Sequence, residues 1–492
     1  ACHSLPTGDR MGEGAMPELA REAPSLEAAG QRLTSHWTRL WLENPAALRN
    51  HVTMPGVFGR FNDEQRIKAI NNVVAFLETR VPASTGEPLP GGKVELGEFL
   101  FEDLGCISCH RLTPPNKEDY FQRTSLWFAG VKYRQGAMAL FLQAPRAHYR
   151  WSRMPDLRLS QEEALALSAF IRVRGQPLPE PAGEPAGDAG KGKTLVVELG
   201  CVQCHPMGKG LEKRSPQVVS PFGGRSGHGC MAADPPSRLP FFDWSENERI
   251  ALAAFLSGQG DSLARNTSVE ATWRFMKELR CHACHTRDVR FADWPEVLFE
   301  EGVAGHPPEN VPLLTWTGEK LRVEWMEKLF AGELAYKPRP WLTARMPSFP
   351  TRGMVIANGL AAEHGLAREV KPGPLPEEGD LKIALKLTLK DGGLDCRQCH
   401  AMGAEILKME NQAYGVSFGY IRHRMRYGFY QRWMLNPLRF DPATKMPRYS
   451  PDRQSTAIKH FFEGDARRQF DSLWHYLDTT RAPTTQIGPP KK

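Results

Sequence analysis

The sequence predicts an all-α protein, built as a tandem array of five helical units. Apolar residues recur at intervals of three and four in segments such as 94–105 and 268–280, which is the periodicity of an amphipathic helix. A set of shared motifs repeats along the chain, and Pro/Gly-rich stretches separate the copies. The alternating pattern of a half-buried strand is scarce, so we expect little sheet.

The Pro/Gly-rich stretches set the boundaries of the units. Residues 81–92 and 175–193 have the composition of linkers, and weaker breaks lie at 257–266 and 367–380. The expected units are 1–84, 90–178, 187–260, 266–368 and 380–482. Each is small for a domain that must build its own core.

Further helices are predicted towards the ends of three units, at 61–80, 159–175 and 243–258. Ser160 and Ser245 precede two of these segments and are suited to N-caps, because acidic residues follow them in the first turn.

Eight of the ten cysteines fall in four copies of C-x-x-C-H. The copies are Cys106-Ile-Ser-Cys109-His110, Cys201-Val-Gln-Cys204-His205, Cys281-His-Ala-Cys284-His285 and Cys396-Arg-Gln-Cys399-His400. This pattern is the attachment signal of c-type haem, because two cysteines three residues apart lie on one helical turn and the adjacent histidine can ligate the iron. A single copy would also fit a redox dithiol or half a zinc site, but four copies at similar spacing favour haem.

Cys2 and His3 have the form of the end of a fifth motif, without its first cysteine. The alternatives are a chance Cys-His pair or a disulfide between Cys2 and Cys230 in an oxidising compartment. A methionine of the kind described next follows His3 as it follows the other histidines, which favours the truncated motif. On this interpretation the numbering begins within a longer chain.

A Met-Pro pair follows four of these five histidines, at Met54, Met154, Met346 and Met446. Proline disfavours helical geometry at the residue before it, so each methionine is expected in an extended loop from which its thioether can project. A thioether opposite an imidazole suits haem iron and raises its reduction potential. The simpler alternative is that these methionines are ordinary core residues.

The third unit lacks this methionine and has Leu239 in its place. Because leucine cannot ligate iron, three interpretations stay open. The haem is five-coordinate and binds a small molecule; or another residue replaces the ligand, with His228 ahead of Met231 and Cys230, or with a residue from another unit; or the haem only spaces its neighbours.

The order helix, C-x-x-C-H, long loop, methionine, helix resembles that of class I cytochrome c. The whole chain resembles the large multihaem c-type cytochromes of bacterial envelopes, including those of planctomycete-like bacteria. The resemblance implies five cytochrome c-like domains with five covalently bound haem c groups. Thioether links are expected at Cys2, Cys106, Cys109, Cys201, Cys204, Cys281, Cys284, Cys396 and Cys399. Proximal ligands are expected at His3, His110, His205, His285 and His400, and distal ligands at Met54, Met154, Met346 and Met446, with His228 as a weaker candidate.

The charge and hydropathy of the chain exclude some partners. The formal charge is +7, but no long Lys/Arg run suggests nucleic acid, and the propionates of five haems would cancel most of the charge. No apolar run approaches the roughly 18 residues of a spanning helix, so no transmembrane segment is expected.

The expected function is the transfer of single electrons between redox partners outside the cytoplasm, in the periplasm or the extracellular space of a bacterial envelope. The partner would be a redox protein or a membrane electron-transfer complex. One alternative is an enzyme with an open-iron site in the third unit, acting on peroxide or on a nitrogen or sulfur oxide. Another is a haem subunit of a larger respiratory assembly or filament. Electron transfer is favoured over catalysis, and no catalytic residue is assigned.

Overall fold

The protein is mostly helical in the part of the chain that the computed structural model describes, which confirms the all-α class. The described residues are 3–4, 23–49, 52–58, 61–80, 91–177, 186–212, 217–218, 231–232, 244–257, 267–304, 311–334, 336–339, 344–403 and 415–480. Within these ranges the named strands form two short parallel pairs, β1 (His3–Ser4) with β4 (Gln217–Val218) and β2 (His110–Arg111) with β3 (Thr124–Ser125). None of the described helices is long and apolar enough to cross a membrane.

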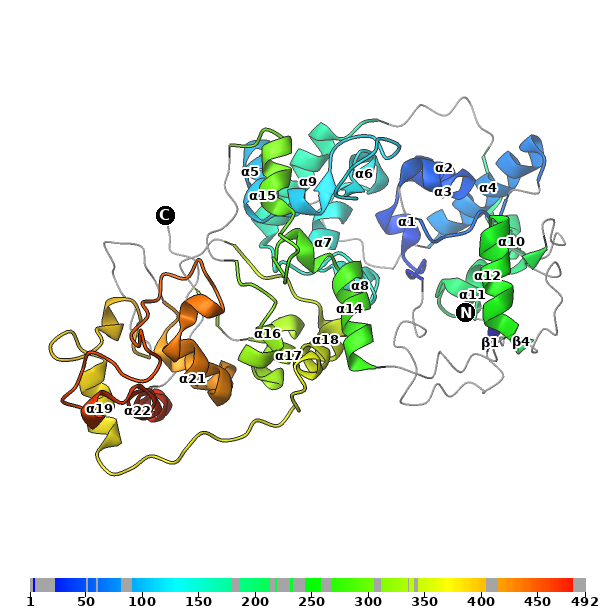
Figure 1. Ribbon diagram of the computed structural model, residues 1–492. Helices are drawn as coiled ribbons and strands as arrows, with labels where there is room; N and C mark the ends of the chain where they lie inside the picture. Colours follow the sequence, from blue (N-terminus) through cyan, green and yellow to red (C-terminus); the bar gives the residue numbers. More distant parts are fainter. Residues whose placement is uncertain are drawn as a thin grey trace. The chain divides into compact units, whose positions relative to one another are not determined.

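The chain divides into two compact units (Figure 1). The first comprises Ala1–Thr267 and Asp293–Pro307, and the second comprises Ser268–Ala292 and Pro308–Lys492. Most of the five predicted domain boundaries fall outside the described residues, so those boundaries stay predictions. Each compact unit contains two copies of one helical arrangement.

One copy in the first unit is contiguous in sequence. It comprises α5 (Val94–Asp103), the 3₁₀ turn η2 (Cys106–Ser108), α6 (Ala129–Lys132), α7 (Ala137–Gln143), α8 (Pro145–His148) and α9 (Gln161–Arg174). The first and last helices, α5 and α9, pack against each other. A further helix, α15 (Trp294–Glu300), packs on η2.

The other copy in the first unit is assembled from two separate stretches. One stretch supplies α1 (Ala29–Arg32), α2 (Ser35–Glu43), α3 (Pro45–Leu48) and α4 (Asp63–Glu78), and the other supplies α10 (Ala189–Glu198) and α11 (Cys201–Cys204). Helix α10 packs against α4, as α5 packs against α9 (Figure 1). The helix α12 (Glu246–Ser257) also belongs to this unit.

Both copies in the second unit are contiguous. The first comprises α14 (Ser268–Glu278), η4 (Cys281–Ala283), α16 (Thr317–Lys320), α17 (Val323–Ala331) and α18 (Pro350–Glu363). The second comprises α19 (Asp380–Leu387), η5 (Cys396–Gln398), η6 (Phe418–Tyr420), α20 (Ile421–Arg424), α21 (Tyr427–Leu435), η7 (Pro437–Arg439), η8 (Phe462–Gly464) and α22 (Ala466–Thr479). Helix α14 packs against α18, and α19 packs against α22.

Within each unit the two copies meet at a single antiparallel β-bridge. The bridge pairs Leu33 with Tyr133 in the first unit and Leu321 with Met425 in the second. The flanking hydrogen bonds are reciprocal: Thr34 N–H donates to the Lys132 carbonyl at 3.0 Å, and Arg134 N–H donates to the Arg32 carbonyl at 2.9 Å. Reciprocal contacts of this kind are typical of a two-fold interface, so each unit is a pseudo-symmetric pair of copies.

The helices predicted at 61–80, 159–175 and 243–258 are present as α4, α9 and α12. Both predicted caps also form. Ser160 and Glu163 make a complete capping box, and the Ser245 hydroxyl accepts from the Glu248 N–H at 3.3 Å.

Gly359 allows the backbones of α14 and α18 to approach closely. A Cβ atom at this position would lie 1.9 Å from the Thr272 hydroxyl and 2.2 Å from the Ser268 carbonyl oxygen. Gly359→Ala is therefore expected to destabilise the protein by about 1–3 kcal/mol. Gly428 lies in α21 with nothing within 4 Å of its Cβ position, so Gly428→Ala is the matched control. It should leave stability unchanged or raise it by up to ~1 kcal/mol. Urea unfolding of the whole chain measures both changes, and equal effects would contradict the close crossing.

Candidate functional site

All four complete C-x-x-C-H motifs form a single helical turn, as the sequence predicts. Each turn is preceded by a residue in the left-handed region: Gly105 (φ 74°), Gly200 (φ 74°), Arg280 (φ 57°) and Asp395 (φ 57°). This residue ends the preceding helix and starts the motif turn. The turn is closed by a hydrogen bond to the carbonyl of the first cysteine, as between His400 N–H and Cys396 at 3.0 Å. Both cysteines and the histidine of a motif therefore lie on one local scaffold.

Three of the motif histidines have one ring nitrogen fixed by a backbone carbonyl. The distances from Nδ1 to oxygen are 2.7 Å for His205 and Pro24, 2.9 Å for His285 and Pro312, and 2.8 Å for His400 and Val416. A carbonyl oxygen can only accept, so Nδ1 is the protonated nitrogen in each ring. Burial lowers the pKa of all three histidines, which favours the neutral imidazole. This tautomer leaves the Nε2 lone pair for a metal, which is the arrangement usual in metal-ligating histidines.

A second contact closes every motif onto a more distant segment. The carbonyl of the residue after each histidine accepts a backbone N–H. The pairs are Arg111 with Leu126 (2.8 Å), Thr286 with Leu314 (3.0 Å), Ala401 with Phe418 (2.9 Å) and Pro206 with Leu26 (2.9 Å). The donor follows the motif in the first three pairs. In the fourth pair the donor, Leu26, precedes the acceptor, Pro206, by 180 residues.

The apolar cores bring predicted cysteines and methionines together. In the second unit Cys396 belongs to one buried cluster, against which Met446 packs, and Cys281 and Met346 both pack against the other. In the first unit the shared core contains Cys201 and Met54. The sequence predicts the first two combinations but assigns no Met-Pro methionine to the motif at 201–205, for which His228, Met231 and Cys230 are the candidates.

Two of the methionine sulfurs accept a hydrogen bond from a tryptophan. The indole N–H of Trp41 lies 3.1 Å from Met54 Sδ, and that of Trp433 lies 2.9 Å from Met446 Sδ. In both cases the tryptophan stands 13 positions before the methionine, so the shared spacing in the sequence is the signal of this bond. Phe141 occupies the corresponding position before Met154 and has no N–H to donate.

Two of the motif cysteines lack the low thiol pKa of a reactive dithiol. Burial raises the pKa of Cys201 to about 11 and that of Cys396 to about 12, so both thiols are protonated at neutral pH. Redox-active C-x-x-C pairs instead have a lowered thiol pKa.

The remaining predicted site residues are less fully described. Met154 is half-buried between α8 and α9, and the Ser152 hydroxyl donates to its carbonyl at 3.2 Å. His3 lies in β1, but its side chain, like Cys2, His228 and Leu239, lies outside the described residues. Cys230 also lies outside them. In the described part of the chain no three His, Cys, Asp or Glu side chains gather in a way that would hold a metal ion.

Basic side chains cluster at the β-bridge of each unit. Burial, together with the neighbouring Arg49 and Arg32, lowers the pKa of Lys132 to about 7. In the second unit burial, together with Arg424 and Arg339, lowers the pKa of Lys320 to about 7. Each lysine lies over an aromatic ring of the other copy, Lys132 at 4.8 Å from Trp37 and Lys320 at 4.7 Å from Trp433. Gathering desolvated cations is costly unless an anion compensates them.

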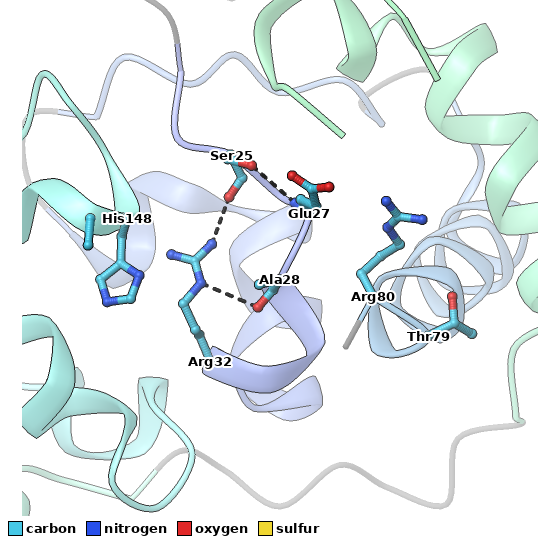
Figure 2. Close-up of a pocket in the computed structure, with 8 residues that line it drawn as sticks. Ser25, Glu27, Ala28, Arg32, Thr79, Arg80 and His148 are labelled. Atoms are coloured by element: carbon cyan, nitrogen blue, oxygen red, sulfur yellow. Dashed lines mark hydrogen bonds between the residues drawn. The ribbon is translucent and has the colours of Figure 1, made fainter. Parts of the chain in front are cut away.

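Arg32 also lines a pocket of about 450 Å³ in the first unit (Figure 2). Its guanidinium donates to the Ser25 carbonyl at 2.7 Å and to the Ala28 carbonyl at 3.3 Å. Arg80 and His148 line the same pocket. Arg32 therefore belongs both to the basic cluster and to the lining of this pocket.

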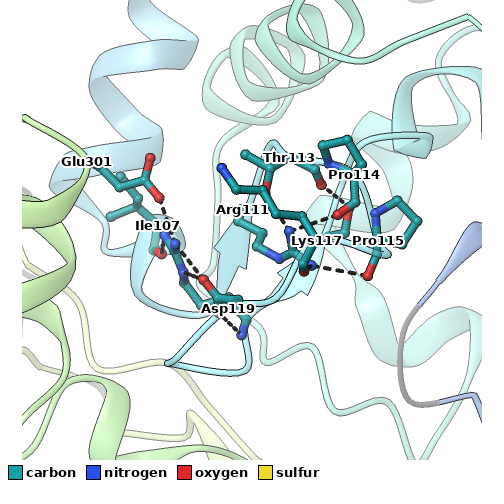
Figure 3. Close-up of polar contacts among 10 residues, drawn as sticks. Ile107, Arg111, Thr113, Pro114, Pro115, Lys117, Asp119 and Glu301 are labelled. Atoms are coloured by element: carbon teal, nitrogen blue, oxygen red, sulfur yellow. Dashed lines mark hydrogen bonds and ion pairs between the residues drawn. The ribbon is translucent and has the colours of Figure 1, made fainter.

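Arg123 forms a buried ion-pair cluster beside the motif at 106–110 (Figure 3). Its guanidinium contacts Asp119 and Glu301, both at 2.7 Å, and donates to the Ile107 carbonyl at 3.5 Å. The side chains of Arg123 and Asp119 are 6% and 8% exposed. Burial alone would raise the pKa of Asp119, but the bonds from Arg123 outweigh it and hold the pKa below 3.8. The cluster links the motif turn to the residues after α15.

Arg123→Met would leave a buried carboxylate without its cation, so we expect a loss of about 2–4 kcal/mol in the free energy of unfolding. Because the folded pKa of Asp119 is depressed, this contribution is complete above the ordinary carboxyl pKa and is lost as pH falls through the lower folded value. The matched control is Arg174→Met, whose ion pair with Glu98 is 55% and 42% exposed and should contribute less than about 1 kcal/mol. Urea unfolding at neutral and acid pH tests this. Equal losses in the two variants would contradict the role of burial.

No family model matches the sequence, and the chain has no match among curated proteins or solved structures.

Proposed function

We propose that this chain is a multihaem c-type cytochrome that transfers single electrons between redox partners outside the cytoplasm. Its C-x-x-C-H motifs would hold haem c covalently. The histidine Nε2 atoms and the Met-Pro methionines would provide the iron ligands.

The observation that carries this proposal is the pairing of donors within each core. A motif cysteine and a Met-Pro methionine share an apolar cluster in three cores, and each of these motifs has its histidine Nδ1 fixed to a carbonyl. Two thiols for attachment, one imidazole nitrogen and one thioether form the donor set that suits haem c. A zinc or dithiol site would need no such methionine.

Bound haem supplies reversible one-electron exchange at iron, and the protein sets its potential through ligands, burial and hydrogen bonds. The His/Met donor set raises the potential. The surrounding core excludes water, and the fixed imidazole tautomer holds the proximal ligand in place.

The basic clusters fit the charge of haem. Lys132 and Arg32 in the first unit, and Lys320 and Arg424 in the second, are half-buried cations at the bridge between two copies. Haem propionates are anions that would compensate them. We therefore propose that these basic residues would hold haem propionates.

Covalent attachment of this kind is an envelope process in bacteria, so we propose a periplasmic or extracellular location. The partners would be a redox protein or a membrane electron-transfer complex, and assembly into a larger complex is compatible with the same role. The total number of haems, five by the sequence motifs, is part of this proposal.

Haem attachment can be tested by producing the whole chain in a host with a cytochrome c maturation system. Peptide mass spectrometry is expected to find haem on the peptides of all four complete motifs. Cys396→Ala/Cys399→Ala should remove one haem and leave the others, since that motif is one independent attachment site. A chain that binds zinc or remains a free dithiol at these motifs would contradict the proposal.

The hydrogen bond from Trp433 to Met446 should raise the potential of the haem bound at Cys396 and Cys399. An N–H donor withdraws electron density from the sulfur and so disfavours the ferric state. Trp433→Phe is expected to lower that midpoint potential by roughly 20–60 mV, the equivalent of one modest hydrogen bond. The control is Trp273→Phe, which removes an exposed tryptophan of the same unit. Spectropotentiometric titration measures the shift, and equal potentials in the two variants would contradict it.

A further inference from the structure

We propose that Met54 is the sixth ligand of the haem attached at Cys201 and Cys204, so that one haem site is built from two stretches of chain with a complete copy inserted between them. This inference rests on the proposed function, because it takes the C-x-x-C-H motifs to bind haem. It assigns a ligand to the motif that has Leu239 where the others have methionine.

In three of the copies the carbonyl that bonds the motif histidine lies at the same number of positions before the bridge residue. For His205 this carbonyl belongs to a residue that precedes the motif in sequence. His205 bonds to Pro24, which lies nine positions before the bridge residue Leu33. In the second unit the histidine partners Pro312 and Val416 also lie nine positions before their bridge residues, Leu321 and Met425. Residues 24–33 therefore occupy the place that follows the motif in the other copies.

The methionine has the same register. Met54 stands 21 positions after Leu33, as Met154 stands 21 after Tyr133 and Met446 stands 21 after Met425. The stretch from Pro24 to Met54 thus corresponds to the segment that, in the other copies, runs from the histidine's carbonyl partner to the methionine. The motif beside this stretch is Cys201-Val-Gln-Cys204-His205.

The helix crossing is also equivalent. The position nine residues before the first motif cysteine is Gly97 in α5 and Gly192 in α10. A Cβ at Gly97 would lie 2.1 Å from the Ala166 carbonyl of α9, and a Cβ at Gly192 would lie 1.9 Å from the Asn72 carbonyl of α4. Each crossing needs glycine because two backbones touch there. Helix α4 therefore takes, beside α10, the position that α9 takes beside α5.

Several further contacts hold the two stretches together. Ala23 N–H donates to the Cys204 carbonyl at 3.1 Å, and Asp188 N–H donates to the Asn72 side chain at 2.8 Å. Arg80 reaches the Met207 carbonyl. Val202 is 1% exposed and lies in the core that Cys201 and Met54 also contact. A thioether therefore lies in the core of the motif at 201–205.

The test measures the near-infrared charge-transfer band that ferric haem shows with a thioether ligand, in the full-length holoprotein. Met54→Ala and Cys201→Ala/Cys204→Ala should each remove the same share of this band. Combining them should remove no more than either does alone. In a Cys396→Ala/Cys399→Ala background, by contrast, Met54→Ala should still remove its full share.

Additive losses from Met54→Ala and Cys201→Ala/Cys204→Ala would show that Met54 serves another haem, such as one at Cys2 and His3, and would overturn this inference alone. A chain without haem at any motif would overturn the proposed function as well.

A second pair of variants tests the inference without removing a cysteine, in case the cysteine variant does not fold. Gly192→Ala is expected to force α10 away from α4. It leaves the identity of every motif residue unchanged. Gly190→Ala changes the same helix, where the Cβ would meet only the Asp188 side chain, at 3.2 Å. Gly192→Ala should reduce the share of the band that depends on Met54, and Gly190→Ala should not. If the band survives Gly192→Ala unchanged, Met54 is not held by α10 and the inference fails.

Discussion

The closure of each motif turn onto a distant segment is the contact on which the rest of the structure depends. In every complete motif it includes the backbone bond from a residue such as Leu314 or Phe418 to the carbonyl after the histidine. In three motifs it also includes the bond between histidine Nδ1 and a carbonyl. Together they fix the imidazole tautomer and place the following β-bridge at a set distance along the chain. The bridge in turn positions the helices that lead to the methionine. Without this closure each motif would be an isolated turn, and the segment that carries the methionine would not be held beside it.

The sequence predicts well what depends on local chemistry. The motif turns, the caps at Ser160 and Ser245, and the helices α4, α9 and α12 all follow from short patterns, and each is present. Cys281 and Met346 lie in one core, and Cys396 and Met446 in another, because in those copies sequence order and spatial order agree. The partnership of Cys201 with Met54 was not predicted, since periodicity within a segment carries no information about which distant segment will complete its core. The missing methionine before Pro240 was the one visible sign, and it left several interpretations open.

The pairing of copies gives the basic residues a common explanation. Lys132 and Lys320 hold equivalent places at the two bridges, yet the copies that carry them differ in most other residues. Each lysine lies over an aromatic ring of the other copy and has further cations nearby, so attraction within the protein alone does not account for the cluster. Carboxylates of bound haem would supply the compensating charge at the point where two copies meet. The basic residues beside the β-bridge would then bind haem carboxylates at the interface between the two copies.

The two-stretch core is physically reasonable despite the 181 residues between Pro24 and His205. Loop-closure entropy grows only with the logarithm of length, so this closure costs about 2 kcal/mol more than one across 16 residues. The actual difference is smaller, because the inserted copy folds on its own core. Its first and last helices pack together and Glu98 pairs with Arg174, so its two ends lie close to each other and it acts as a short connection. Insertion of a folded unit whose ends are close is among the best tolerated changes of connectivity. The inserted copy also forms the bridge to the composite one through Tyr133 and Leu33, and so stabilises the core that it interrupts.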